Sequence, residues 1–266
     1  MINYFQVREN RVACWINPQD FGKHPQSLVF LHGSGGHCGA WAYQYAQLHK
    51  EFNIAAVDLP GHGQSSAKGE SDIASYVQRL REILGVLQLA NPILVGHSLG
   101  AAIVLSFATE PSPDICGIVT VGGGLTMPVN PDMISGFRAA PEIALDMMCK
   151  FSLARENQEK LFAPLRKSLG ETDVETVAGD MLACSKFDLT GAVQKIKTPA
   201  LVICGTKDKM MPPASSEQIA RAIPGAKLVL IEGAGHMVMM EQPEAFNTAL
   251  TDFVRGRKPA PGQENG

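Results

Sequence analysis

Short apolar runs of strand length alternate with amphipathic stretches along almost the whole chain. The later runs lie at residues 28–31, 54–57, 93–95, 115–121, 200–204 and 227–231. Strands of a parallel sheet are buried on both faces and so are continuously apolar, and the crossover between two of them is usually a helix. The alternation therefore predicts an α/β fold with a mostly parallel, twisted sheet flanked by helices.

An opening hairpin and two strongly patterned helices complete this expectation. Residues 2–7 and 12–16 are strand-like runs at the N-terminus and predict an antiparallel hairpin. Apolar side chains recur at steps of three and four over residues 71–87 and 242–254. Because that spacing places them on one face of a helix, both segments are predicted to be helices that pack against the sheet.

Residues 125–186 break the alternation. Strand-like runs stop there, and the segment is rich in methionine. Four prolines interrupt it, at positions 128, 131, 141 and 164. Since the segment falls between two predicted strands, we expect a helical cap inserted into an α/β core made of residues 1–124 and 187–255.

The composition is that of an ordinary globular protein. The 266 residues are 45% hydrophobic and 18% charged, with a net charge of −3. We find no basic stripe typical of nucleic-acid binding and no apolar run near the roughly 20 residues of a membrane helix, so neither partner is expected. The N-terminus lacks the pattern of a signal peptide, which predicts a cytoplasmic protein. Residues 256–266 are rich in Pro, Gly and polar side chains and predict a disordered tail.

Neither a metal nor a cofactor is expected. The six cysteines are scattered without a Cys-x-x-Cys pair, and the seven histidines show no metal-ligand spacing. The oligomeric state stays open at this level.

Ser98 lies between Gly96 and Gly100, after one apolar run and before a helix-compatible one. A serine hydroxyl is a poor nucleophile at neutral pH, so it needs a base, a donor for the developing oxyanion and a backbone that exposes its oxygen. The two glycines allow a sharp strand-to-helix turn that would push Ser98 into a cleft. The pattern alone is short enough to arise by chance, and a helix N-cap is the structural alternative for Ser98.

Three further loops carry the groups that Ser98 would need. The segment His32-Gly33-Ser34 follows the run at residues 28–31, Asp208 follows the run at 200–204, and His236 follows the run at 227–231. In open α/β sheets, functional groups gather at the carboxyl ends of the strands. The sequence therefore predicts one site that contains serine, aspartate and histidine in that chain order.

Competing residues are few. Asp180 and Asp188 rival Asp208 in chain order but lie in or beside the predicted cap, whereas His236 is the only histidine after position 97. Three other histidines near glycine-rich loops are expected to be structural: His32, His62 and His97.

With these loops in this order, the chain resembles the cap-bearing members of the α/β-hydrolase family from about Val12 to Val254. The run Asp58-Leu59-Pro60-Gly61-His62-Gly63-Gln64-Ser65 belongs to the same resemblance. The resemblance implies that Ser98 is the nucleophile, His236 the general acid/base and Asp208 the group that orients His236. It also implies that the backbone N–H groups of Ser34 and Leu99 form the oxyanion hole.

The expected substrate is a small molecule with a largely apolar acyl group. Three methionines adjoin the start of the predicted cap, the acid and the base, and methionine fills adaptable apolar pockets. The predicted lining is Met127, Met210 and Met237, together with Gly33 of the glycine loop. Such a site predicts a carboxylesterase-like serine hydrolase that cleaves an ester, thioester or lactone through an acyl-enzyme on Ser98.

Two alternatives remain at this level. The first is hydrolysis of a carbon–carbon bond in a vinylogous diketone, where arginines of the cap would bind a substrate carboxylate; the candidates are Arg138, Arg155 and Arg166. The second is a ligand receptor or regulatory protein whose triad turns over slowly or not at all.

Overall fold

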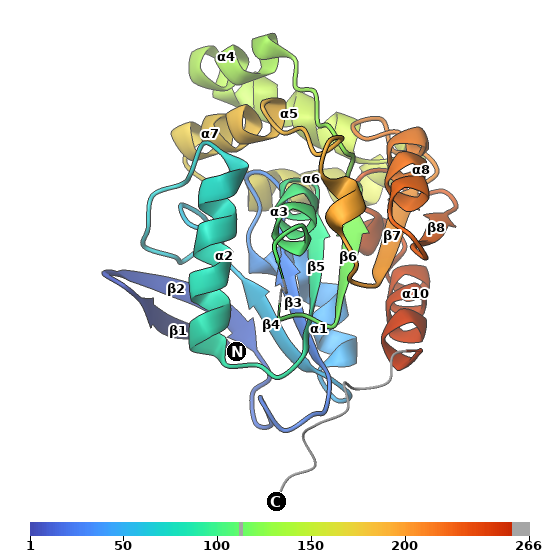
Figure 1. Cartoon of the computed structure of the whole chain (residues 1–266). Coiled ribbons are helices and arrows are strands. Elements are labelled where there is room, and N and C mark those ends of the chain that lie inside the picture. The colour runs from blue at the N-terminus through green and yellow to red at the C-terminus, as the bar shows by residue number, and fades with distance from the viewer. Residues whose placement is uncertain (112–113, 257–266) are drawn as a thin grey trace, which may run out of the picture.

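An eight-stranded sheet runs through the molecule in the computed structural model, which describes residues 1–111 and 114–256 (Figure 1). Its strands are β1 (Ile2–Val7), β2 (Asn10–Ile16), β3 (Ser27–Leu31), β4 (Asn53–Val57), β5 (Pro92–His97), β6 (Gly117–Val121), β7 (Ala200–Gly205) and β8 (Lys227–Ile231). The order across the sheet is β1-β2-β4-β3-β5-β6-β7-β8. The β1–β2 hairpin and the β2–β4 pair are antiparallel, and all other neighbours are parallel. The predicted α/β fold with a mostly parallel sheet is confirmed.

Helices connect the strands. They are α1 (Ala42–Leu48), α2 (Ile73–Leu87), α3 (Leu99–Ala108), α4 (Pro131–Ala139), α5 (Pro141–Ser152), α6 (Gln158–Leu169), α7 (Val174–Ser185), α8 (Pro213–Ala222), α9 (Val238–Glu241) and α10 (Pro243–Arg255). Short 3₁₀ turns lie at Cys38–Trp41, Arg155–Asn157 and Val193–Lys195. Among these described helices, none combines the length and apolar composition that crossing a membrane requires.

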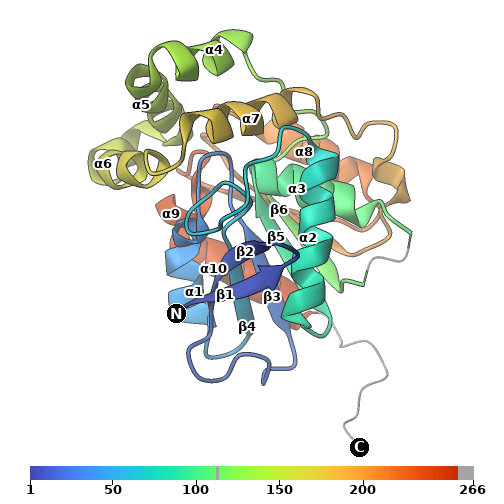
Figure 2. The same ribbon diagram turned by 90° about the vertical axis from the view of Figure 1, so that its left-hand side faces the viewer.

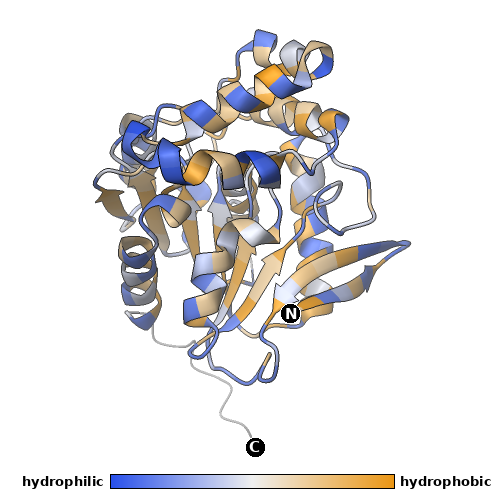
Figure 3. Cartoon of the chain, turned by 180° about the vertical axis from the view of Figure 1, so that it is seen from behind, coloured by the Kyte–Doolittle hydropathy of each residue, from blue (hydrophilic) through white to orange (hydrophobic). Residues whose placement is uncertain are grey.

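The two faces of the sheet carry separate apolar cores. Successive side chains of a strand point to opposite faces, so Leu31 belongs to the core shared with α2, α3 and α8, whereas Phe30 belongs to the core shared with α1 and α10. Figure 2 shows these helices on either side of the sheet, and Figure 3 shows hydrophobic strands behind helices of mixed polarity. Because both faces are covered, every residue of β3 to β7 is buried, whereas the edge strand β8 buries only Ile231.

Some helices and strands begin at other residues than predicted, because a capping side chain, a proline or a pairing strand determines where each one starts. Helix α2 begins at Ile73 instead of residue 71 because the Asp72 carboxylate caps it, accepting from Ser75 N at 2.8 Å. Helix α10 begins with Pro243, a residue favoured at the first helical position. Strand β6 begins at Gly117 instead of residue 115, because its parallel pairing with β5 starts there.

Residues 125–186, called the inserted segment below, contain α4 to α7. Figures 1 and 2 show these helices lying across the end of the sheet toward which the parallel strands point. Apart from an isolated bridge between Thr126 and Asp188, the described residues of this segment form no β-structure. The predicted disordered tail at 256–266 lies outside the described residues, except for Gly256.

Candidate active site

Ser98 occupies a strained turn between β5 and α3. Its backbone has φ 52° and ψ −113°, a positive φ that non-glycine residues rarely adopt. The turn needs glycine on both sides: a Cβ on Gly96 would lie 2.1 Å from Gly100 O, and a Cβ on Gly100 would lie 2.5 Å from Leu31 O. The Ser98 N–H donates to Val121 O at 2.9 Å, which ties the turn to β6. The two glycines of this turn thus let the chain direct the half-buried serine out of β5 and toward a cavity.

Asp208 and His236 form a buried pair in the loops after β7 and β8. His236 Nδ1 donates to Asp208 Oδ2 at 2.8 Å, and His236 is only 3% and Asp208 only 5% exposed. The other carboxylate oxygen, Oδ1, accepts from the N–H groups of Met210 and Met211 at 2.9 and 2.8 Å. Since Nδ1 carries the proton that this carboxylate accepts, Nε2 of the neutral ring has a free lone pair.

The structure brings the three predicted triad residues to one place without closing the last hydrogen bond. Ser98 and His236 line the same cavity. Within the described residues, no hydrogen bond joins Ser98 Oγ to His236 Nε2. Such bonds are often long in ligand-free enzymes and shorten when substrate binds, so the missing bond does not rule out proton transfer between these groups.

The two predicted oxyanion donors lie on either side of this serine. Ser34 follows β3 and lines the cavity, and Leu99 is the first residue of α3. The first N–H groups of a helix have no acceptor inside the helix. In the part of the chain that the structure describes, neither the Ser34 nor the Leu99 N–H donates to a protein acceptor. Neither N–H is therefore used by the described residues; Ser34 lines the cavity, whereas Leu99 reaches it only through its neighbour Ser98.

His97 supports the site through the backbone. Its Nε2 donates to the carbonyl oxygen of His236 at 3.0 Å, and the two rings lie 4.6 Å apart. Burial, and then the nearby His236, hold the pKa of His97 well below its ordinary value. A neutral ring that already holds the His236 carbonyl is placed to fix the His236 loop, not to act as a second base.

His32 and His62 make different hydrogen bonds in the glycine loops. His32 Nδ1 donates to Gly33 O at 2.8 Å and its Nε2 accepts from Leu59 N at 3.0 Å, which requires a neutral ring. Burial, and then His62, keep the pKa of His32 well below its ordinary value. His62 instead bonds Asp180, one of the two aspartates that competed with Asp208 in the sequence.

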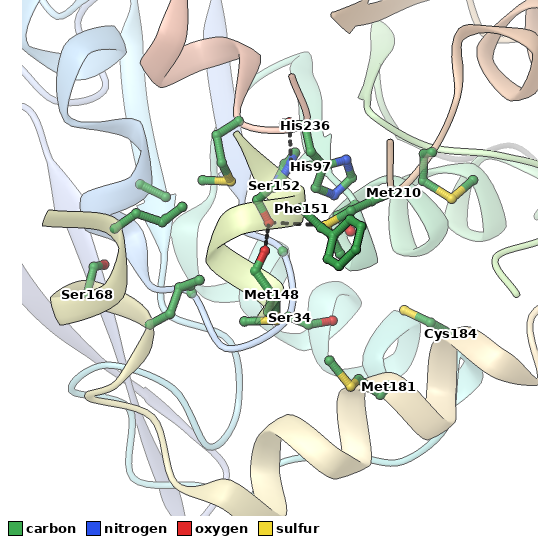
Figure 4. Close-up of a pocket in the computed structure, with 18 of the residues that line it drawn as sticks. Ser34, His97, Met148, Phe151, Ser152, Ser168, Met181, Cys184, Met210 and His236 are labelled. Atoms are coloured by element: carbon green, nitrogen blue, oxygen red, sulfur yellow. Dashed lines mark hydrogen bonds between the residues drawn. The ribbon is translucent and has the colours of Figure 1, made fainter. Parts of the chain in front are cut away.

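Ser98 lines a cavity of about 750 Å³, a volume typical of small-molecule sites. Figure 4 shows this cavity, with Ser34, His97 and His236 among the labelled lining residues. All four residues predicted to line it do so: Gly33, Met127, Met210 and Met237. Sequence reasoning did not single out the remaining methionines of the lining, which are Met133, Met147, Met148, Met181, Met211 and Met240. The methionine enrichment of the inserted segment was a signal for four of them, Met133, Met147, Met148 and Met181, but not for Met211 and Met240. Ser152 Oγ lies within hydrogen-bonding distance of Met148 O at 2.7 Å and of Met210 Sδ at 3.1 Å.

None of the three arginines considered for a substrate carboxylate lines this cavity. Arg138 is paired with Glu175 at 2.9 Å, and Arg166 is paired with Glu142 and Asp146. The cations that do line the cavity are Lys167 and Lys209.

One group of metal-type side chains in the described residues, His37, Cys38 and Asp58, has ligand atoms within 4.8 Å of one another. Its lone pairs are already used: His37 Nδ1 accepts from Gly39 N, and the Asp58 oxygens accept from the N–H groups of Cys38 and Gln64. Burial, and then Asp58, raise the pKa of the Cys38 thiol, which disfavours the thiolate that a metal needs. These contacts give no support to a metal site there.

The chain is similar to known proteins in both sequence and structure. Residues 28–249 match the sequence pattern of the alpha/beta hydrolase family. The dihydrolipoyllysine-residue acetyltransferase component of the acetoin cleaving system from Pseudomonas putida is 28% identical over 92% of this chain and 67% of its own length. The 2-hydroxy-6-oxononadienedioate/2-hydroxy-6-oxononatrienedioate hydrolase from Paraburkholderia phymatum is 27% identical over 94% of each chain. The enol-lactonase from Burkholderia xenovorans LB400 is 26% identical with a TM-score of 0.88, covering 95% of this chain and all of its own.

Proposed function

Because the chain belongs to the alpha/beta hydrolase family, we propose that it is a serine hydrolase that cleaves an ester, thioester or lactone of a small, largely apolar acyl substrate. One observation carries the proposal: the buried Asp208–His236 hydrogen bond lies at the same methionine-lined cavity as the strained Ser98. That combination supplies a nucleophile, a base and an apolar place for the acyl group.

The reaction follows from the protonation state of His236. Its Nε2 takes the proton of Ser98 Oγ while the oxygen attacks the acyl carbon, and the Ser34 and Leu99 N–H groups donate to the resulting oxyanion. The imidazolium, stabilised by Asp208, then protonates the leaving oxygen or sulfur, and an acyl-enzyme remains on Ser98. Water activated by His236 attacks that ester, and the acid leaves with the free serine restored.

The inserted segment acts as a cap in this proposal. It contributes most of the methionines around the cavity, among them Met127, Met148 and Met181. Because methionine side chains are flexible and polarisable, such a lining adapts to different apolar acyl groups. The apolar character of the lining supports an uncharged acyl group.

Ester or lactone cleavage is favoured over carbon–carbon cleavage. The enol-lactonase likeness supports a lactone, and the 2-hydroxy-6-oxononadienedioate hydrolase relative keeps a carbon–carbon hydrolase as the second candidate. The second candidate needs a cation for the substrate carboxylate. Arg138 and Arg166 are paired with acidic side chains and do not line the cavity, so Lys167 and Lys209 are the cations left for that role. The ester or lactone reaction makes no such demand.

An activity screen over p-nitrophenyl esters, thioesters, lactones and vinylogous diketones tests the proposal, with Ser98→Ala as the control. We expect turnover of at least one acyl class, a burst of the first product, and covalent labelling by a fluorophosphonate that the control lacks. Turnover of the diketones alone would support the carbon–carbon reaction instead. Saturable ligand binding without turnover or labelling would contradict the serine-hydrolase proposal and support a receptor.

A further inference from the structure

The Ser34 N–H belongs to a tight turn that is fixed at each of its peptide groups. Gly36 N donates to Gly33 O at 3.0 Å and closes the turn. His32 Nδ1 donates to the same oxygen at 2.8 Å. Since Gly33 O and Ser34 N–H are the two ends of one peptide group, these bonds fix the direction of the N–H from inside the turn.

The next two peptide groups are fixed from outside, by the inserted segment. Gly35 N donates to Asp180 Oδ2 at 3.0 Å, and Gly35 O accepts from Thr172 Oγ1 at 2.8 Å. Asp180 lies in α7, and Thr172 lies between α6 and α7. Neither residue lines the cavity, so neither touches a substrate bound there.

Asp180 is itself held rigidly. Its side chain is fully buried, and it accepts from Tyr76 OH at 2.5 Å through Oδ1 and from His62 Nε2 at 2.9 Å through Oδ2. Tyr76 belongs to α2, and His62 belongs to the loop after β4. The carboxylate therefore joins the inserted segment, two elements of the core and the turn that carries Ser34.

The surroundings of His62 explain how a charge can be buried there. Its Nδ1 donates to Pro60 O at 2.9 Å, and both of its acceptors, a carbonyl and a carboxylate, require an N–H, so the ring carries two protons. Burial lowers the pKa of His62, but the charge and hydrogen bond of Asp180 outweigh it and raise the pKa above its ordinary value. Asp58 adds to this effect, and the neighbouring His32 ring, 4.7 Å away, is neutral.

From these contacts we propose that Asp180 and Thr172 are positioning residues for the oxyanion hole: through Gly35 they hold the turn that aims the Ser34 N–H. The inserted segment then has two roles, since it shapes the acyl cavity and also completes the hole. The inference rests on the proposed serine-hydrolase function. It adds to that function two residues from outside the cavity whose loss lowers the rate of the chemical step.

A structural role alone predicts something different, and the chain offers matched variants to separate the two. Thr172→Val removes only the hydroxyl that binds Gly35 O, and Thr172→Ser keeps it. Asp180→Ala removes the oxygen that accepts the Gly35 N–H, whereas Asp180→Asn would keep an acceptor there. Tyr76→Phe removes a partner of the other Asp180 oxygen and leaves every bond of Gly35 in place.

The experiment measures kcat and KM of the 266-residue protein with the best p-nitrophenyl ester, and its melting temperature in a separate thermal melt. Losing an oxyanion donor typically costs about 10² to 10³ in rate, so a misdirected donor should lower kcat about 10- to 100-fold in Asp180→Ala and about 3- to 10-fold in Thr172→Val. We expect KM to change by less than about threefold, because the hole acts on the transition state. Thr172→Ser should retain kcat within about twofold, and Tyr76→Phe within about threefold even if its melting temperature falls.

Two outcomes overturn the inference while leaving the proposed function intact. One is an active wild type with unchanged kcat in folded Thr172→Val, which decides the question even if Asp180→Ala does not fold. The other is a loss of kcat in Tyr76→Phe equal to that in Asp180→Ala, which would make the effect one of general packing because Tyr76→Phe leaves the bonds of Gly35 in place. A wild type without turnover or fluorophosphonate labelling defeats the proposed function, and this inference falls with it.

Discussion

The molecule contains two buried aspartate–histidine pairs that look alike locally. The Asp208–His236 bond is 2.8 Å long and the Asp180–His62 bond is 2.9 Å. Each aspartate accepts two further hydrogen bonds: Asp208 from two backbone N–H groups, and Asp180 from Gly35 N and the Tyr76 hydroxyl. The pairs differ at the second nitrogen of the histidine.

That second nitrogen decides what each pair can do. His236 lines the cavity with Nε2 free to take a proton, whereas the Nδ1–H of His62 is held by Pro60 O. A ring with one open nitrogen can cycle between neutral and charged forms during a reaction. A ring with both nitrogens donating is fixed as a cation and serves as a structural tie. An aspartate next to a buried histidine is therefore not by itself a sign of catalysis.

Replacing each histidine with glutamine should produce the largest difference between the two pairs. Glutamine keeps a donor but cannot act as a base, so His236→Gln should lower kcat by about 10⁵-fold or more. His62→Gln should lower the melting temperature but keep kcat within about tenfold. Steady-state kinetics and thermal melts of both variants check this, and a comparable loss of kcat in the two would refute the distinction.

Asp208→Asn tests the aspartate that binds His236. An amide stabilises the wrong tautomer of His236 and cannot stabilise the imidazolium, so kcat should fall by about 10³- to 10⁴-fold. The hydrogen bonds from Met210 and Met211 to Oδ1 are kept by the amide oxygen, and the melting temperature should change little. Kinetics and a thermal melt measure the two effects, and retention of full activity would remove Asp208 from its proposed role.

The pH dependence of stability separates the charged histidine from the neutral ones. The raised pKa of His62 means that its stabilisation is complete below the unfolded value of about 6.5 and is lost as the pH rises through the folded pKa. The lowered pKa values of His32 and His97 act in the opposite direction: their stabilisation is present above about pH 6.5 and is lost as the pH falls below it.

The difference in melting temperature between wild type and His62→Gln should therefore be largest below about pH 6.5 and shrink toward alkaline pH. Fluorimetric melts over a range of buffers measure it, with Tyr76→Phe as a control that leaves the His62 bonds intact. A difference that stays constant with pH would mean that His62 is not the cation inferred from its hydrogen bonds.

The smallest expected effect concerns Met237, which follows His236 in the chain and lines the cavity. Met237→Leu conserves volume but removes flexibility, so it should shift the ratio of kcat/KM between long and short acyl esters by roughly two- to fivefold. Arg138→Ala, which alters an ion pair away from the cavity, is the control and should leave this ratio unchanged. An unchanged ratio in Met237→Leu would argue that the methionine only fills space.

The sequence allowed the Asp208–His236 pair to be predicted but not the Asp180–His62 pair. Asp208 and His236 each follow a predicted strand directly, and the carboxyl ends of parallel strands meet at one edge of the sheet. Asp180 and His62 are 118 residues apart, and their contact depends on how α7 docks onto the core. Local pattern carries no information about that docking, so Asp180 appeared only as a rival of Asp208.

The same distinction holds for the fold. Continuous apolar runs predicted the strands because burial on both faces demands them, and the shifts at Gly117 and Ile73 reflect pairing partners and a capping side chain that lie outside the run. The helical pattern of the inserted segment predicted helices, and its composition is rich in methionine. That composition could not indicate which methionines face the cavity, because that depends on the packing of α5 and α7 over the strand ends.

Trapping the covalent intermediate tests the central claim most directly. The protein is mixed with its best ester or lactone, quenched in acid during the burst, and analysed by intact-mass and peptide mass spectrometry. The account predicts a mass increase equal to the acyl group on the peptide that contains Ser98, and no adduct in Ser98→Ala. Continued turnover by Ser98→Ala, with no adduct on the wild-type serine, would contradict it.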